Sequence, residues 1–190
     1  SARCPIQLEL DHVAGFDARL AHASLRGELS PLADPLEFRA WLELEGLVHP
    51  SVALDEARIA VAGTPARFSV EGRGQGLHER FELAAALALD GPNKTIDLSE
   101  LVLVSSRGAS PAEVVLAAPT RIVIRPEKIV VNEMRARALG GSIVVDGHVG
   151  LAGTTSDLQV ALHTIDLARL DALIPGPHLS GVLDLEGELR

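Results

Sequence analysis

Apolar and polar residues alternate with a period of two along most of the chain. The clearest segments are residues 6–10, 38–45 and 81–89, in which large aliphatic or aromatic side chains occupy every second position. This spacing is typical of half-buried β-strands. Short runs rich in Gly, Pro, Asp and Ser separate the segments, so hairpin connections are expected. The pattern predicts an all-β chain folded as an antiparallel meander.

One stretch departs from the period of two, and it predicts a short helix near residues 165–174. Leu167, Leu170, Leu173 and Ile174 recur there at helical spacing. Thr164 or Asp166 can cap the start, and Pro175-Gly176 can end the helix. Such a helix can plug one end of the sheet or lie along its rim.

A five-residue pattern, apolar-x-apolar-acid-Gly, occurs five times with the glycine in phase with the apolar residues. The copies are LELEG at 42–46, FSVEG at 68–72, LALDG at 87–91, IVVDG at 143–147 and LDLEG at 183–187. A glycine on the apolar face lets a sheet curl toward that face, while the acid keeps the outer face hydrated. Alternatively, the Asp-Gly or Glu-Gly pair in each copy simply marks a turn. Shared phase in all five copies favours a curved sheet.

Composition narrows the functional classes. The chain has 190 residues and a formal net charge of -9, and its 17 Lys and Arg are scattered among 26 acids. Nucleic acid is therefore not expected as a partner, because phosphate binding needs a basic surface. Residues 1–190 are expected to form a single segment cut from a longer protein. Aromatic residues make up only 3%, which is little for a closed core.

No catalytic grouping is evident, so an enzyme is not expected, and neither a cofactor nor a metal site is predicted. GRGQG at 72–76 lacks the helix and the Lys-Ser/Thr of a phosphate loop and is predicted to be a hairpin turn. Asp146 and His148 could share one strand face and bind a metal, but two outer-face polar residues are the simpler interpretation. Trp41 is in phase with acids and is expected to pack against a neighbouring segment on the polar face.

A curved sheet with few aromatic residues fits an open hydrophobic groove, a β-taco, better than a packed sandwich. An uncovered apolar trough would expose more surface than a soluble protein usually tolerates without a purpose. Acyl chains are the expected occupants. The main alternative is a structural or chaperone-like scaffold that holds unfolded strands at its exposed sheet edges.

Residues 98–189 resemble the repeating core of the TamB family, in the AsmA-like group of bridge-like lipid transfer proteins. The similar motifs are APTRIVI, GGSIVVDGHVGLAG, IDLARLDALIPG and LSGVLDLEGEL, in that order. The resemblance implies a periplasmic segment of a protein anchored in the inner membrane, with an Omp85-class outer-membrane subunit, TamA, as partner. It implies phospholipid transport between the two membranes, or assistance to outer-membrane protein assembly.

By this resemblance, the candidate groove-lining residues are the bulky residues in phase with the glycines, and ordinary core packing is the alternative for each of them. These are Phe81, Leu83, Leu87, Leu89, Ile143, Val145, Val149, Leu158, Val160, Leu162, Leu183 and Leu185.

Overall fold

The computed structural model describes residues 3–15, 17–31, 33–49, 52–107, 110–151, 153–172 and 179–189. Its strands are β1 (Cys4–Gly15), β2 (Ala18–Ser30), β3 (Glu37–His49), β4 (Val52–Thr64), β5 (Arg67–Gln75), β6 (Glu79–Asp90), β7 (Asn93–Ser105), β8 (Ala112–Leu116), β9 (Thr120–Ile124), β10 (Lys128–Ala138), β11 (Gly141–Gly150), β12 (Asp157–Asp166) and β13 (Val182–Leu189). One 3₁₀ helix, η1 (Leu167–Ala172), precedes β13.

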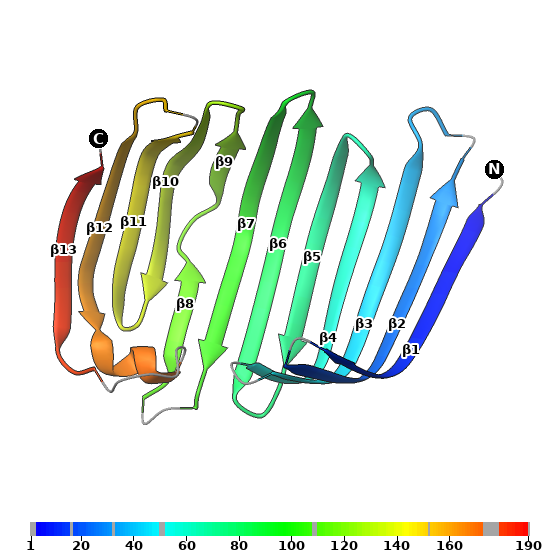
Figure 1. The fold of residues 1–190 in the computed structure, drawn as a ribbon, viewed down its shortest axis with the longest axis horizontal. Helices are drawn as coiled ribbons and strands as arrows, with labels where there is room; N and C mark the ends of the chain where they lie inside the picture. Colours follow the sequence, from blue (N-terminus) through cyan, green and yellow to red (C-terminus); the bar gives the residue numbers. More distant parts are fainter. Residues whose placement is uncertain are drawn as a thin grey trace.

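All 13 strands form one antiparallel sheet in which sequence neighbours are spatial neighbours (Figure 1). The short strands β8 and β9 share one position between β7 and β10. β1 and β13 lie at opposite edges of the sheet, and the two termini are correspondingly far apart (Figure 1). The predicted all-β antiparallel meander is confirmed.

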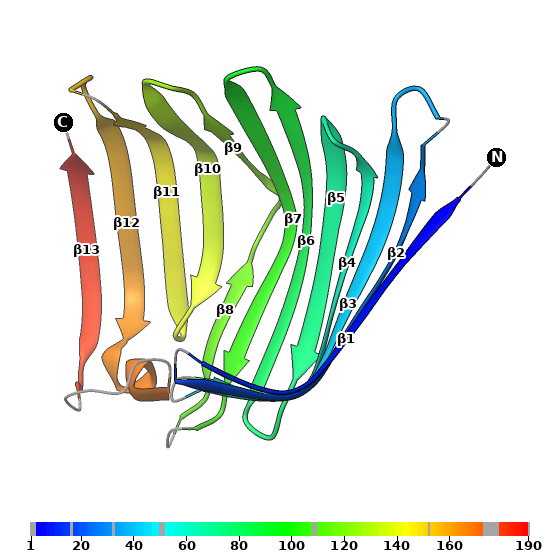
Figure 2. The same cartoon turned by 45° about the vertical axis from the view of Figure 1, so that its right-hand side comes forward.

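The sheet is curved, and the strands at its β1 edge bend sharply near one end (Figure 2). His12 on β1 and Gly46 on β3 have φ values of 54° and 62°, a left-handed backbone that interrupts a regular strand. A second set of irregularities crosses the middle of the sheet. On β7, Ser99 is an extra residue in the pairing with β6. On β10, the register shifts between Val131 and Met134. The break between β8 and β9 lies between these two bulges. Bulges of this kind bend and twist a sheet locally.

The predicted helix is present as a 3₁₀ helix, and it begins two residues later than expected. Residues 165 and 166 still belong to β12, where they pair with Leu183 and Val182, and η1 begins at Leu167. The Asp166 carboxylate accepts the N–H of Ala168 at 3.1 Å, which makes Asp166 the capping residue. Thr164 instead has a φ of 56° in a bulge of β12. The predicted stop at Pro175-Gly176 lies outside the described residues.

GRGQG is not the turn that the sequence predicts. Gly72 and Gly74 lie within β5, and the turn begins only at Gly76. A Cβ at Gly74 would stand 2.4 Å from Cε1 of Phe81, so these glycines make room for an aromatic ring on the next strand. The turn at Gly91-Pro92, by contrast, is confirmed as a tight connection between Asp90 and Asn93.

Candidate apolar binding face

The strand register divides the sheet into two chemically different faces. Residues paired across antiparallel strands project from the same side of a sheet. The side of the sheet from which Phe81 projects carries mostly Leu, Val, Ile, Phe, Ala and Gly. We call this side the apolar face and the opposite side the outer face.

One row of the apolar face crosses every position of the sheet without a polar side chain. The row consists of two runs of directly paired residues, one from β1 to β7 and one from β8 to β13. The first run ends at Leu101 and the second begins at Leu116, next to the pair Val102–Val115. The row is Leu8, Leu25, Leu42, Ile59, Gly72, Leu83, Leu101, Leu116, Ala136, Ile143, Leu162 and Leu185. With strands about 4.8 Å apart, it extends on the order of 60 Å.

The structure places all twelve predicted groove-lining residues on this one face. Four of them lie in the row above, and the others lie in the rows beside it. Leu89 and Leu185 are exposed, at 39% and 48%, and the remaining ten are half-buried. Among the described residues, no large side chain is fully buried. A second covering layer would have buried these side chains.

The predicted groove-lining set left out two aromatic members of the face, Phe38 and Phe68. Phe38 and Phe68 flank Gly63 in one row, with ring centroids 6.2 Å apart. A Cβ at Gly63 would stand 2.3 Å from the carbonyl oxygen of Arg67, so the glycine lets the backbones approach between the two rings. The period of two that identified Phe81 also applies to Phe38 and Phe68, and it could have found them.

A cluster of buried residues lies at one end of the apolar face. Ala112, Ala138, Leu139 and Ile165 are buried there, and Leu170 of η1 packs against them. Of the two placements that the sequence allows, a plug at one end of the sheet or a position along its rim, η1 takes the one at the end (Figure 1).

The buried carboxylate of Glu79, on the apolar face at the same end of the sheet, forms an ion pair with Arg107. η1 and this ion pair thus mark a boundary of the apolar surface.

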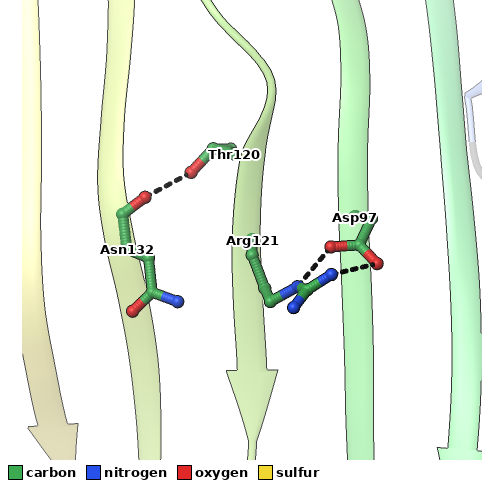
Figure 3. A network of polar contacts seen from close by, with 4 residues as sticks. All are labelled: Asp97, Thr120, Arg121 and Asn132. Atoms are coloured by element: carbon green, nitrogen blue, oxygen red, sulfur yellow. Dashed lines mark hydrogen bonds and ion pairs between the residues drawn. The ribbon is translucent and has the colours of Figure 1, made fainter.

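The outer face is charged, and several of its ion pairs join neighbouring strands. Arg121 on β9 donates from Nε to Asp97 on β7 at 2.5 Å and from Nη2 at 3.1 Å (Figure 3). These hydrogen bonds raise the pKa of Arg121. The preceding residue, Thr120, pairs with Leu98 and so projects from the apolar face; its hydroxyl donates to the carbonyl oxygen of Asn132 on β10 at 2.9 Å (Figure 3). The polar contacts thereby join the three strands around the break between β8 and β9.

Trp41 lies on the outer face, paired with Arg26 and Ala60, and is half-buried. It borders an open hollow of about 760 Å³ together with Arg58, Glu71 and other residues. Charged side chains line much of this hollow, so it offers no continuous apolar surface to a hydrocarbon chain.

Asp146, which the sequence raised as half of a metal pair, has a different role in the structure. Its Oδ1 accepts the N–H of Glu133 at 2.8 Å, and Glu133 is a bulge residue with a φ of 45°. Within the part of the chain that the structure describes, no group of three or more His, Cys, Asp or Glu residues could hold a metal ion. The described residues include no helix with the length and hydropathy needed to cross a bilayer.

Comparison of the chain with protein-family models, with curated proteins and with solved structures finds no match.

Proposed function

We propose that the apolar face binds the acyl chains of phospholipids and conducts them between the inner and outer membranes. In this proposal the chain is a periplasmic groove segment of a TamB-like protein. The observation that carries it is the unbroken apolar row across the sheet, left without a covering layer by the described residues. The inner and outer membranes and the Omp85-class partner enter the proposal through the resemblance of residues 98–189 to the TamB family.

Exposed leucines support a bound apolar ligand. Leu103 and Leu185 are 40% and 48% exposed although they lie on the apolar face. Each methylene of an acyl chain that leaves water for such a surface gains about 0.8 kcal/mol. Transfer from a bilayer onto the same surface is nearly neutral, which suits movement along a groove. Headgroups can stay in water at the open side.

The burial of small residues supports a sheet that curls toward the apolar face. Ala23 and Ala57 lie on that face close to the sharp bend and are only 6% exposed. Leu54, beyond the bend, is buried as well. Side chains on the inside of a bend crowd one another, whereas those on the outside spread apart. A curl in this direction would turn the apolar face into a groove.

A second candidate function is a scaffold that assists outer-membrane protein assembly through the sheet edges. β1 is exposed along its whole length, and its edge away from β2 has no partner strand among the described residues. Such an edge can add a strand from another polypeptide. This candidate uses backbone pairing and does not need the apolar face to hold lipid.

Paired aspartate substitutions on the two faces test the proposal. Val145→Asp with Leu185→Asp places two charges on the apolar face. Val144→Asp with Val182→Asp adds the same charge to the same two strands on the outer face. Because an unpaired carboxylate is costly beside hydrocarbon, we expect roughly tenfold or lower phospholipid binding and transfer for the first variant. The second variant should retain both.

The measurements are mass spectrometry of phospholipid that co-purifies with the chain and transfer of a fluorescent phospholipid between vesicles. Circular dichroism establishes that both variants keep the β-sheet. Unchanged lipid content in the apolar-face variant, or an equal loss in both variants, would reject the proposal.

A further inference from the structure

From β5 to β13, the paired positions of the apolar face carry an Asp, Glu, Lys or Arg at only two places among the described residues. Glu79 is the first residue of β6 and pairs with Ser105. Lys94 is the second residue of β7 and stands between Leu89 of β6 and Ile124 of β9. Because β6 and β7 run antiparallel, the starts of these strands lie at opposite ends of the sheet (Figure 1). The two charges thus mark the two margins of the apolar face.

The margin that carries Glu79 is already closed. Glu79 is only 9% exposed and forms an ion pair with Arg107. Beside it, Leu170 of η1 packs on the buried cluster that includes Ala112 and Leu139. A phosphate entering there would have to break a buried ion pair, which is costly, and the carboxylate of Glu79 would repel it. This margin therefore suits the apolar part of a lipid better than its headgroup.

The margin that carries Lys94 is open and offers two cations. Arg125 directly follows Ile124, the residue with which Lys94 pairs. Lys94 and Arg125 are exposed, and within the described part of the chain neither forms an ion pair. Directly opposite residues of neighbouring strands have Cβ atoms roughly 5 Å apart, so these two long side chains can contact one anion. Leu89, which pairs with Lys94, is 39% exposed.

The charge at this margin is opposite in sign to that of the whole chain. Three turns meet there, at residues 64–67, 90–94 and 124–128. Their charged residues are Arg67, Asp90, Lys94, Arg125, Glu127 and Lys128. Basic residues thus outnumber acids here, whereas the whole chain has a formal net charge of -9. An anionic group is attracted to this margin more than to the rest of the protein.

We infer that Lys94 and Arg125 bind the phosphate of a phospholipid headgroup, while the acyl chains of the same lipid lie on the apolar face and extend from Leu89 toward the η1 end. The inference rests on the proposed function and adds to it the place and the chemistry of the headgroup contact. Ammonium and guanidinium groups form charge-assisted hydrogen bonds with phosphate oxygens. An exposed leucine beside a cation matches an amphiphile, whereas a free phosphate ion would use the cations alone.

The test compares two lipids with the same acyl chains, dihexanoyl-phosphatidylglycerol and dihexanoylglycerol, of which only the first contains a phosphate. Isothermal titration calorimetry measures their binding to the 190-residue chain. Lys94→Gln with Arg125→Gln should weaken phosphatidylglycerol binding about fivefold, because two exposed ionic contacts are lost. The same double variant should bind dihexanoylglycerol as the unaltered chain does, because the apolar face is unchanged.

Arg26→Gln with Arg73→Gln is the matched control. Both arginines are exposed outer-face residues without an ion pair among the described residues, and the change in net charge is the same. The control should bind both lipids normally. A nitroxide on the phospholipid headgroup should broaden the NMR amide signal of Lys94 more than the signals of Leu167–Ala172.

Unchanged phosphatidylglycerol binding in the Lys94 and Arg125 variant, an equal loss in the control, or stronger broadening at η1 would each overturn the inference. Inorganic phosphate that binds the unaltered chain as tightly as the phospholipid would overturn it as well, by showing a site for the free ion. In all four cases dihexanoylglycerol binding would still support the apolar face as an acyl-chain site. Binding of neither lipid to the unaltered chain would reject the proposed function, and the inference with it.

Discussion

His22 and Asp11 form a cross-strand pair on the outer face, beside the sharp bend of β1 and β2. The ring Nδ1 of His22 lies 2.7 Å from Oδ1 of Asp11. This hydrogen bond is the main cause that raises the pKa of His22 above its ordinary value of 6.5, with Glu45 and Glu9 adding attraction and desolvation opposing it. A raised pKa in the folded chain means that protonation of His22 favours the fold.

The stabilisation from His22 should therefore be fully present below pH 6.5 and lost as the pH rises through the raised pKa. We expect Asp11→Asn to lower the pKa of His22, because the charged acceptor is removed. An NMR titration of the His22 ring protons in both proteins measures this. A His22 pKa that does not fall in the variant would contradict the assigned pairing.

Two acids within the repeated segments have more specific roles than keeping a surface hydrated: Asp146 stands at the acid position of its copy, and Asp184 at the x position of the copy at 183–187. Asp146 accepts the N–H of Glu133, and Asp184 accepts the N–H of Thr164 at 2.8 Å. Both N–H groups belong to bulge residues with positive φ, whose ladder hydrogen bonds are disrupted. The alternation predicts that both carboxylates lie on the outer face. It does not reveal the bulges, because each lies on a different strand from the acid that caps it.

At the scale of elements, η1 ties the end of β12 to β8 and β10. Leu170 packs on the buried cluster of Ala112, Ala138 and Leu139. Arg169 joins Asp166 at 3.2 Å and the carbonyl oxygen of Pro111 at 3.4 Å. A helix this short has little stability of its own. Its place in the fold therefore depends on these contacts.

Leu170→Ala should lower the free energy of unfolding by about 1 to 2 kcal/mol, since it removes half-buried apolar contacts at the end of the sheet that η1 covers. Leu77→Ala is the control, because that leucine is 82% exposed and the same atoms are deleted; its effect should stay within about 0.5 kcal/mol. Urea unfolding followed by circular dichroism compares the two. Equal effects would show that η1 contributes no packing energy.

At the scale of the whole molecule, an open sheet derives its stability mainly from each strand and its immediate neighbours. β1 is paired on one side only and is exposed throughout, whereas β6 is paired on both sides. Local opening is easiest where few buried contacts must be broken. The stability of the sheet should therefore fall from its interior to the β1 edge.

Amide hydrogen exchange read by mass spectrometry should show faster exchange in β1 than in β6 under native conditions. The comparison is limited to amides that donate a hydrogen bond to a neighbouring strand. The amides of β1 that face away from β2 are left out of it. Equal protection of the two strands would indicate that the sheet opens as one cooperative unit.

The alternation of apolar and polar residues determined the strands, and the short turns determined their antiparallel order. Because side chains alternate strictly within a regular strand, the sequence also predicts which residues of each strand share a side, whereas the strand pairings put Leu83, Ile143 and Leu185 on the same face. Only the tertiary structure decided where the sheet bends, that residues 72–75 belong to β5 with Gly72 and Gly74 against the Phe81 ring, and that η1 begins at Leu167. Those features depend on contacts between strands, and a bulge or a close backbone approach is fixed by a partner that the local sequence does not contain.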